Sequence, residues 1–332
     1  RAVIASAAND HRLGANEAPP AILSVYLGTQ LESVFNDIKE GKLLEKAKGG
    51  LMDLGLSQIL QFERDPGDRN RTSPFAFTGN RFEFRAVGSS QSVSGPLVAM
   101  NTMLADSLNW IAEKLEAVIA EGEDKTSAVI TVLQELMQLH GNVIFGGDGY
   151  SSEWHKAAVE ERGLKNIPTS ADALPAFKEE SVVKLFESTG VLSPAELASR
   201  FEVYAEQYVL SIEVEAKIVI GMANTRIYPA TVKYLDSLSS AATNLSALNI
   251  TISHNSIDEI AAETDAMMAA VSKLKEALSV EEFDSTEAHM NHCAHVLCPL
   301  MLEVRSHADA LELVVSDDLW PLPKYQEMLF IK

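Results

Sequence analysis

Five consecutive residues, Arg81-Phe82-Glu83-Phe84-Arg85, alternate charged and aromatic side chains in a chain whose net charge is −20. This period of two predicts a β-strand, in which successive side chains point to opposite faces. Arg81, Glu83 and Arg85 would then share one face. A carboxylate between two guanidiniums stays ionised and can ligate a hard cation, while the arginines hold phosphate oxygens. The alternative is a solvent-facing strand whose Arg-Glu-Arg ladder is self-paired.

Two further arginines, Arg69 and Arg71, lie just before this strand and are linked to it by "TSPFAFTGN". A turn predicted at residues 78–80 would fold Arg71 back beside the charged face. Four arginines and one glutamate on one surface repel each other unless an anion sits among them. The cluster therefore favours a polyphosphate-binding site over a charged surface that binds no ligand.

A second candidate is the stretch "NDHRLGANEAPP", which reads as a loop. Arg12 could clamp a carboxylate through its planar fork, and Glu17 could accept a hydrogen bond from an ammonium or amine. The two prolines that follow predict a helix over "AILSVYLGTQLESVFNDI". The alternative is a plain surface loop that leads into this helix.

Two other stretches carry chemistry-bearing residues. In "HMNHCAHVLC", His289, His292 and Cys293 share a helix face, but the run continues into an ordinary amphipathic helix and no second ligand pair follows, so we favour core packing over a metal site. Cys293 and Cys298 are not expected to form a disulfide, because five residues apart on a helix they face different ways. The stretch "FGGDGYSSEW" lacks a phosphate-loop lysine and reads as a structural loop.

Elements of two kinds must position these residues. Seven of the eleven arginines precede residue 86, in a first part that is irregular and strand-bearing, and a long helical part follows. The helical period predicts helices over 95–120, 127–139, 255–277 and 280–314, and a long helical pair from 193. Ser193 with Glu196 forms a capping box, Ser151 or Ser152 caps another helix, and Pro229 should kink or break the pair.

Composition excludes several classes of protein. A net charge of −20 argues against nucleic acid and anionic membranes as partners, because phosphate backbones need clustered basic residues over a broad face. No apolar run approaches the roughly 18 residues of a membrane-spanning helix. Two cysteines in 332 residues fit a reducing compartment, and we expect a cytoplasmic protein.

Four ordered stretches, "NDHRLGANEAPPAI", "NRTSPFAFTGNRFEFRAVGSS", "IFGGDGYSSEW" and "LWPLPKYQEMLF", together closely resemble type III glutamine synthetase. The resemblance implies an α+β fold: the C-terminal part of the catalytic domain, with few antiparallel strands, over 1–100, and a long, mainly α-helical region over 101–332. It implies ATP-dependent ligation of ammonia to glutamate through a γ-glutamyl phosphate. It also implies Mg²⁺ or Mn²⁺ as cofactor and a homo-oligomer built as rings, with active sites between subunits.

On the phosphate side, the resemblance assigns roles residue by residue. Glu83 is similar to the strand glutamate that ligates the metal ion bridging the ATP phosphates. Arg85 is similar to the arginine that holds the transferring phosphoryl group and the substrate. Arg81 resembles an ATP-contacting arginine, and Arg71 resembles the arginine that contacts ATP and stabilises the transition state.

On the glutamate side, the resemblance assigns two residues. Arg12 is similar to the arginine near the glutamate carboxylate, so it is a substrate-binding candidate. Glu17 is similar to the loop glutamate that closes the site and helps to take the proton from ammonium. The glycine in "RLGANE" suits a loop that moves to keep water from an acyl phosphate.

Two departures from the family pattern shape the expectation. The family has an arginine where this chain has Ala76. Its paired metal-binding glutamates and its metal-binding histidine lie upstream of the arginine that Arg12 matches, and only eleven residues precede Arg12 here. We therefore expect the chain to be a C-terminal fragment that is inactive by itself. The alternative is a non-catalytic helical assembly or regulatory protein derived from this fold.

Overall fold

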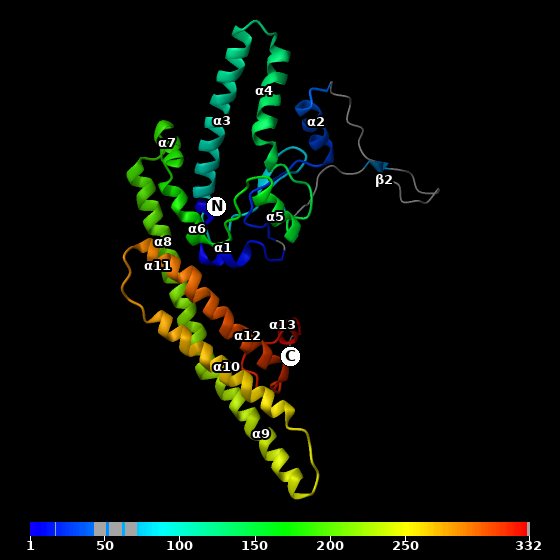
Figure 1. The fold of residues 1–332 in the computed structure, drawn as a ribbon, viewed down its shortest axis with the longest axis vertical. Helices are drawn as coiled ribbons and strands as arrows, with labels where there is room; N and C mark the ends of the chain where they lie inside the picture. The colour runs from blue at the N-terminus through cyan, green and yellow to red at the C-terminus, as the bar shows by residue number, and fades with distance from the viewer. Residues whose placement is uncertain (17, 43–50, 53–61, 64–71, 331–332) are drawn as a thin grey trace. The chain divides into compact units, whose positions relative to one another are not determined.

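The computed structural model describes residues 1–16, 18–42, 51–52, 62–63 and 72–330. They form two compact units, Arg1–Tyr204 and Ala205–Lys332, which divide inside one long helix. The fold is mostly helical with a small sheet in the first unit, as the α+β expectation had it (Figure 1). The division into catalytic and helical domains near residue 100 stays a prediction.

Three short strands form the sheet of the first unit, in the order β1 (Val25–Tyr26), β4 (Phe75–Phe77) and β5 (Phe82–Phe84). The strand predicted around Glu83 is confirmed as β5, which pairs antiparallel with β4. The predicted turn joins them: the Thr78 N–H donates to the Arg81 carbonyl over 2.9 Å, and Gly79 adopts φ +93°. A second, two-stranded sheet pairs β2 (Leu51–Met52) with β3 (Phe62–Glu63).

The pairing of β1 with β4 is parallel, although only antiparallel strands were expected. Parallel neighbours need a long connection between them, and the chain from Tyr26 to Phe75 supplies it. Part of that connection is α2 (Thr29–Lys39). The helix predicted to begin after Pro19 and Pro20 is wrong over its first half, because β1 occupies residues 25–26 and Gly28 (φ 79°) precedes the helix.

Residues 1–12 also differ from expectation. The sequence predicts a loop that includes Asn9–Arg12. Instead, η1 (Ala2–Ile4) is a 3₁₀ turn and α1 (Ala7–Arg12) is a new helix. Ser6 caps α1, since its hydroxyl accepts from the Asn9 N–H over 3.1 Å.

The helices of the first unit follow the predicted pattern more closely. α3 (Ser94–Ala120) and α4 (Lys125–His140) are adjacent in sequence and form a hairpin, drawn in cyan-green in Figure 1. Asp124 caps α4 by accepting from the N–H groups of Thr126 and Ser127. The remaining elements are η2 (Gly141–Val143), α5 (Ser152–Glu160), α6 (Ser170–Ala173), η3 (Leu174–Lys178), α7 (Glu180–Ser188) and the beginning of α8 (Pro194–Met222).

The two predicted caps in this unit are confirmed. The Ser151 hydroxyl accepts from the Trp154 N–H over 3.2 Å at the start of α5. At the start of α8, the Glu196 carboxylate accepts from the Ser193 N–H over 2.8 Å while the Ser193 hydroxyl accepts from the Glu196 N–H over 3.3 Å. This reciprocal pair is a capping box.

The second unit is built from the rest of α8 and further helices, of which four elements pack on α10 (Asn255–Leu278). These four are η4 (Ala223–Ile227), α9 (Tyr228–Ala247), η5 (Cys293–Leu297) and α12 (Cys298–Val314), and the unit also contains α11 (Thr286–His292) and the short α13 (Tyr325–Leu329). The predicted helix from Val280 starts later, at Thr286. The core consists of fully buried apolar side chains: Ile212, Ile260, Met267, Leu274, Met290, Leu297 and Leu311.

The sequence predicted that Pro229 would kink or break the helical run, and the break does not occur, because the run continues through it. Proline lacks an N–H, and its ring clashes with the carbonyl four residues earlier. The chain meets this with the π-helical turn η4, whose bond runs from the Tyr228 N–H to the Ala223 carbonyl. The π-turn η5 precedes Pro299 at the same spacing, so the same solution is used twice.

None of the helices within the described residues is both long enough and apolar enough to span a lipid bilayer.

Candidate functional site

The charged face of β5 is the centre of the candidate site. The Glu83 carboxylate accepts from the Arg85 guanidinium through Nη2 at 3.2 Å and Nε at 3.3 Å, and its other oxygen lies 3.6 Å from Arg81 Nε. The predicted common face is thus confirmed. The Glu83 side chain is 40% exposed and Arg81 is 72% exposed, whereas Arg85 is 20% exposed. The site is an acid held between an open cation and a partly buried one.

The aromatic face of the same hairpin lies behind these charges. The Phe75 and Phe84 rings have centroids 4.8 Å apart, and Phe77 and Phe82 follow at 5.3 Å. These cross-strand pairs fix the register of β5, because opposite residues of an antiparallel pair share a face. Phe82 remains half exposed, so this face is only partly covered.

Ala76 lies directly opposite Glu83 in this register and beside Tyr26 in the parallel pair. Its side chain is fully buried at the middle of the three-stranded sheet. An arginine at this buried position would place its charge inside the protein, and burying a charge without a partner costs free energy. Alanine at this position therefore fits the local packing, and any phosphate contact that the family arginine makes must come from another residue.

Arg12 is brought to the same strand from 73 residues away in sequence. Its Nη2 donates to the Arg85 carbonyl over 2.8 Å, and its Nη1 donates to Asn9 Oδ1 over 2.9 Å. A guanidinium has five donor hydrogens, so these two bonds leave others for a ligand. The predicted carboxylate clamp and the predicted phosphate face are therefore adjacent.

Asn9 is a residue of this site that sequence reasoning missed. It is 1% exposed, and its amide nitrogen donates to the Ile4 carbonyl over 2.8 Å and to the Ala86 carbonyl over 3.0 Å. Together with Arg12 it fastens α1 to the end of β5. A signal was available, since an asparagine three residues before an arginine shares its helix face, but the helix itself was not predicted.

Three of the predicted residues, Glu17, Arg69 and Arg71, lie outside the described residues. Their roles stay predictions. The next residue after Arg71, Thr72, is described and contacts the glycine-rich loop: the Gly149 N–H donates to Thr72 Oγ1 over 3.0 Å. A Cβ on Gly149 would lie 2.7 Å from the Thr72 carbonyl oxygen, so only glycine allows this approach.

The glycine-rich loop packs as a structural loop, as its sequence indicated. The Phe145 N–H donates to the Val25 carbonyl of β1 over 3.0 Å, and the Phe145 ring stacks on Trp154 at 3.6 Å. Trp154 is buried with Ile22 and Ala158. The loop thus extends the edge of the small sheet and supports it.

The histidine and cysteine cluster of the second unit has partners other than a metal. His289 Nε2 lies 3.0 Å from Glu213 Oε1, and His292 Nε2 lies 3.0 Å from the Ala277 carbonyl. Cys293 and Cys298 are not joined in a disulfide. Burial, aided by the nearby Glu213 carboxylate, raises the pKa of Cys293 to about 12. A neutral buried thiol is a core residue rather than a ligand.

Within the described ranges, no group of three or more histidine, cysteine, aspartate or glutamate side chains is arranged to hold a metal ion. The metal-ligand role of Glu83 stays a prediction, and a hard cation there would need further ligands from outside the described residues.

Comparison with known proteins adds an independent finding. Residues 128–246 match the family model of the glutamine synthetase C-terminal domain. The chain is 38% identical over 343 residues to the type-3 glutamine synthetase of Dictyostelium discoideum, covering all of this chain and 46% of that protein. It is 36% identical over 348 residues to the glutamine synthetase of Bacteroides fragilis (strain YCH46), again covering all of this chain and 47% of that protein.

The chain spans about half the length of the curated relatives it matches. The match covers the C-terminal half of those proteins. The similarity extends over the whole chain and therefore over both compact units, α1, the β4–β5 hairpin and the long helices included. Along its whole length, the chain therefore matches the type-3 glutamine synthetases, over the C-terminal half of their sequence.

Proposed function

We propose that the protein to which this chain belongs ligates ammonia to glutamate at the expense of ATP, and that this chain supplies part of the phosphate-binding and glutamate-binding groups. The observation that carries the proposal is the bond from Arg12 to the Arg85 carbonyl, since it joins a carboxylate clamp to the Arg-Glu-Arg face. The two substrates of the first step are an anionic carboxylate and a polyphosphate, and both need cations close to where they bind.

The reaction divides into two steps. A γ-carboxylate oxygen of glutamate attacks the γ-phosphorus of ATP, the bond to the β-phosphate oxygen breaks, and ADP leaves. Ammonia then attacks the γ-carbonyl carbon, phosphate leaves, and a base takes a proton from the nitrogen. Arg85 and Arg81 neutralise the equatorial phosphoryl oxygens, Arg12 orients the glutamate, and we assign the base to Glu17 and transition-state contacts to Arg71.

Glu83 is the residue proposed to hold Mg²⁺ or Mn²⁺. The ionised carboxylate, half exposed and open on the side of Arg81, suits a hard cation, although it is a single ligand. When bound, the cation supplies charge neutralisation on the phosphates. The contribution of this chain is to hold the carboxylate in place through its bonds from Arg85.

The test uses the full-length protein that contains this chain, assayed for phosphate release that depends on both glutamate and ammonia. Glu83→Gln removes the charge but keeps the shape, and we expect kcat to fall on the order of 100-fold or more. Arg85→Lys should lose a comparable amount, because lysine cannot reproduce the forked contact.

Glu135→Gln is the matched control. Glu135 is also a half-exposed glutamate paired with a cation, since it accepts from Lys114 Nζ over 2.6 Å and is 37% exposed, but it lies between α3 and α4. The Glu135→Gln variant should keep wild-type activity. Wild-type activity in Glu83→Gln would contradict the proposal. A wild-type protein that binds Mg·ATP without turnover would support the non-catalytic alternative.

A further inference from the structure

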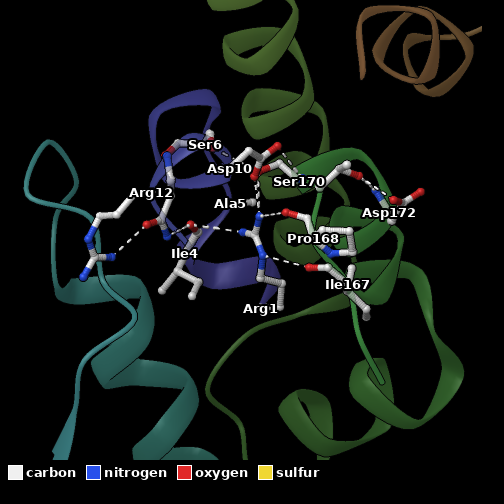
Figure 2. A network of polar contacts seen from close by, with 12 residues as sticks. Arg1, Ile4, Ala5, Ser6, Asp10, Arg12, Ile167, Pro168, Ser170 and Asp172 are labelled. Carbon is white, nitrogen blue, oxygen red and sulfur yellow. Dashed lines mark hydrogen bonds and ion pairs between the residues drawn. The ribbon is translucent and has the colours of Figure 1, made fainter. Parts of the chain in front are cut away.

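Helix α1 carries polar side chains on two faces that bind different parts of the first unit. Asn9 and Arg12 bind the carbonyls of Ala86 and Arg85 at the end of β5. On the other face, the Asp10 carboxylate accepts from the Ser170 N–H, and the Ser6 carbonyl just before the helix accepts from the Ser170 hydroxyl, at the start of α6. Figure 2 shows Arg12 on one side of the helix and Asp10 with Ser170 on the other. The short helix therefore bridges the candidate site and the helical region.

The Asp10 carboxylate is fully engaged on the second face. Its Oδ2 accepts from the Ser170 N–H over 2.7 Å, and its Oδ1 accepts from the Ser170 hydroxyl over 2.6 Å. The Arg1 guanidinium forms an ion pair with the same carboxylate. Ser170 is fully buried, and Asp10 and Arg1 are 14% and 5% exposed. Removing one partner would leave a buried charge or donor without its bond.

Arg1 extends the same network to the preceding residues. Its Nε donates to the Ile167 carbonyl over 3.2 Å and its Nη2 donates to the Pro168 carbonyl over 3.0 Å. A third contact reaches the Ile4 carbonyl at 3.4 Å (Figure 2). The segment from Ile167 to Ser170 is thus held against α1 by both a carboxylate and a guanidinium.

A helix of six residues is too short to hold its own position. The orientation of α1, and with it the position of the Arg12 guanidinium, must come from these flanking contacts. The contacts to β5 come from Asn9 and from Arg12, which also has to bind substrate. The contacts to Ser170 involve neither residue, so together with Asn9 they can hold the helix whatever Arg12 binds.

We propose that Asp10 and Ser170 are positioning residues for glutamate binding: they fix α1 on the helical region so that Arg12 stays beside Arg85. This inference rests on the proposed function, and it goes beyond it by giving the region after residue 166 a part in substrate affinity. The glutamate side of the site then depends on a contact that spans 160 residues of sequence, while the phosphate side on β5 does not.

The experiment measures KM for glutamate, KM for Mg·ATP and kcat in the full-length protein. Asp10→Asn places an amide where the carboxylate accepts three bonds, and we expect KM for glutamate to rise roughly tenfold. Ser170→Ala removes the hydroxyl but keeps the N–H bond to Asp10, so KM for glutamate should rise by a few-fold. KM for Mg·ATP should stay within about twofold in both variants, because β5 is not displaced.

Thr169→Ala is the matched control in the adjacent position. The Thr169 hydroxyl caps α6 by accepting from the Asp172 N–H over 3.1 Å, and it makes no bond to α1. Its loss destabilises the same short helix, so a merely structural role would affect Thr169→Ala and Ser170→Ala alike. We expect only Ser170→Ala to raise KM for glutamate.

The outcomes separate this inference from the proposed function. A wild-type protein that forms no glutamine contradicts the proposed function. An active wild type whose Ser170→Ala and Asp10→Asn variants keep the wild-type KM for glutamate, or raise both KM values equally, overturns the positioning role. Should Asp10→Asn fail to fold, Ser170→Ala against Thr169→Ala decides the question alone.

Discussion

At the scale of single residues, the two cysteines differ sharply in their surroundings. Cys293 has no exposed surface, and burial with the nearby Glu213 carboxylate raises its pKa to about 12. Because the thiolate is the reactive form, only about one molecule in ten thousand carries it at pH 8. Cys298 is partly exposed on the next turn. We expect iodoacetamide at pH 8 to modify Cys298 in the native protein and to reach Cys293 only after unfolding.

The measurement is peptide mass spectrometry after labelling with and without denaturant. A Cys298→Ser variant serves as the control. In its native form, neither of these two positions should take up label over the same time. Equal labelling of Cys293 and Cys298 in the native protein would show that the helix around η5 opens readily, contrary to the packing described.

Single residues also show where sequence reasoning succeeds. Glu83 and its arginines could be predicted, because strand alternation alone places Arg81, Glu83 and Arg85 on one face. Asp10 could not be paired with Ser170 in the same way. Their contact joins positions 160 residues apart, and no periodic pattern in either segment points to the other. Neighbouring residues determine local geometry such as strand alternation, whereas the contact between Asp10 and Ser170 depends on the fold of the whole unit.

At the scale of elements, the start of α8 offers a local test. The Ser193 hydroxyl satisfies the Glu196 N–H, which has no partner inside the helix. We expect Ser193→Ala to speed amide hydrogen exchange in the first turn of α8 about fivefold, as loss of an N-cap typically does. Exchange within α3 should be unchanged in the same molecule, which provides an internal control. Equal rates in the first turn would show that the cap adds nothing to this helix.

The same cap predicts a dependence on pH. The Ser193 N–H bond, with the Ser193 hydroxyl bond second, lowers the pKa of Glu196 below its ordinary 4.5. A group whose pKa is lowered on folding contributes stability above its unfolded pKa and loses it as the pH falls through the folded value. The protection of this first turn should therefore be full at pH 7 and fade below about pH 4.

Glu196→Gln is the variant that checks this sign. At pH 7 its first turn should exchange faster than the wild type, and the difference should shrink as the pH falls towards the pKa of the folded wild-type carboxyl. A difference that grew on acidification would contradict the assignment. Reading exchange in one turn keeps the many other carboxylates of this acidic chain from obscuring the result.

Elements also show which predictions fail and why. The cap at Ser193 is local and was predicted, whereas the helix expected after Pro20 gives way to β1, which pairs with β4 some 50 residues later. Tertiary pairing overrides helical propensity there. The π-turns before Pro229 and Pro299 were not predicted either. Apolar periodicity continues through each proline, and both π-turns pack against α10, a contact that no local pattern in the sequence indicates.

At the scale of the whole molecule, the family match runs through the division between the two compact units inside α8. The four motifs that carry the resemblance lie at distant points of the sequence, so the resemblance identified the fold class better than periodicity did. Periodicity indicated helices but could not give their grouping. The grouping depends on contacts such as those between α10 and α12, which no short segment encodes.

The last prediction concerns this chain prepared by itself. Glu83 is the metal ligand that we propose in it. Its described residues contain no group of three or more histidine, cysteine, aspartate or glutamate side chains that could hold a metal ion, and it spans about half the length of its relatives. A cation held by one carboxylate is weakly bound, so the phosphates of ATP would keep most of their charge at the site. We therefore expect the 332-residue chain to form no glutamine from ATP, glutamate and ammonia, while the full-length protein in the same assay does. Adding the missing half as a separate polypeptide should restore activity if the two halves assemble, and Glu83→Gln in this chain should abolish that restored activity. Turnover by the isolated chain at the rate of the full-length protein would show that its own residues complete the metal site, and would overturn this view of the fragment.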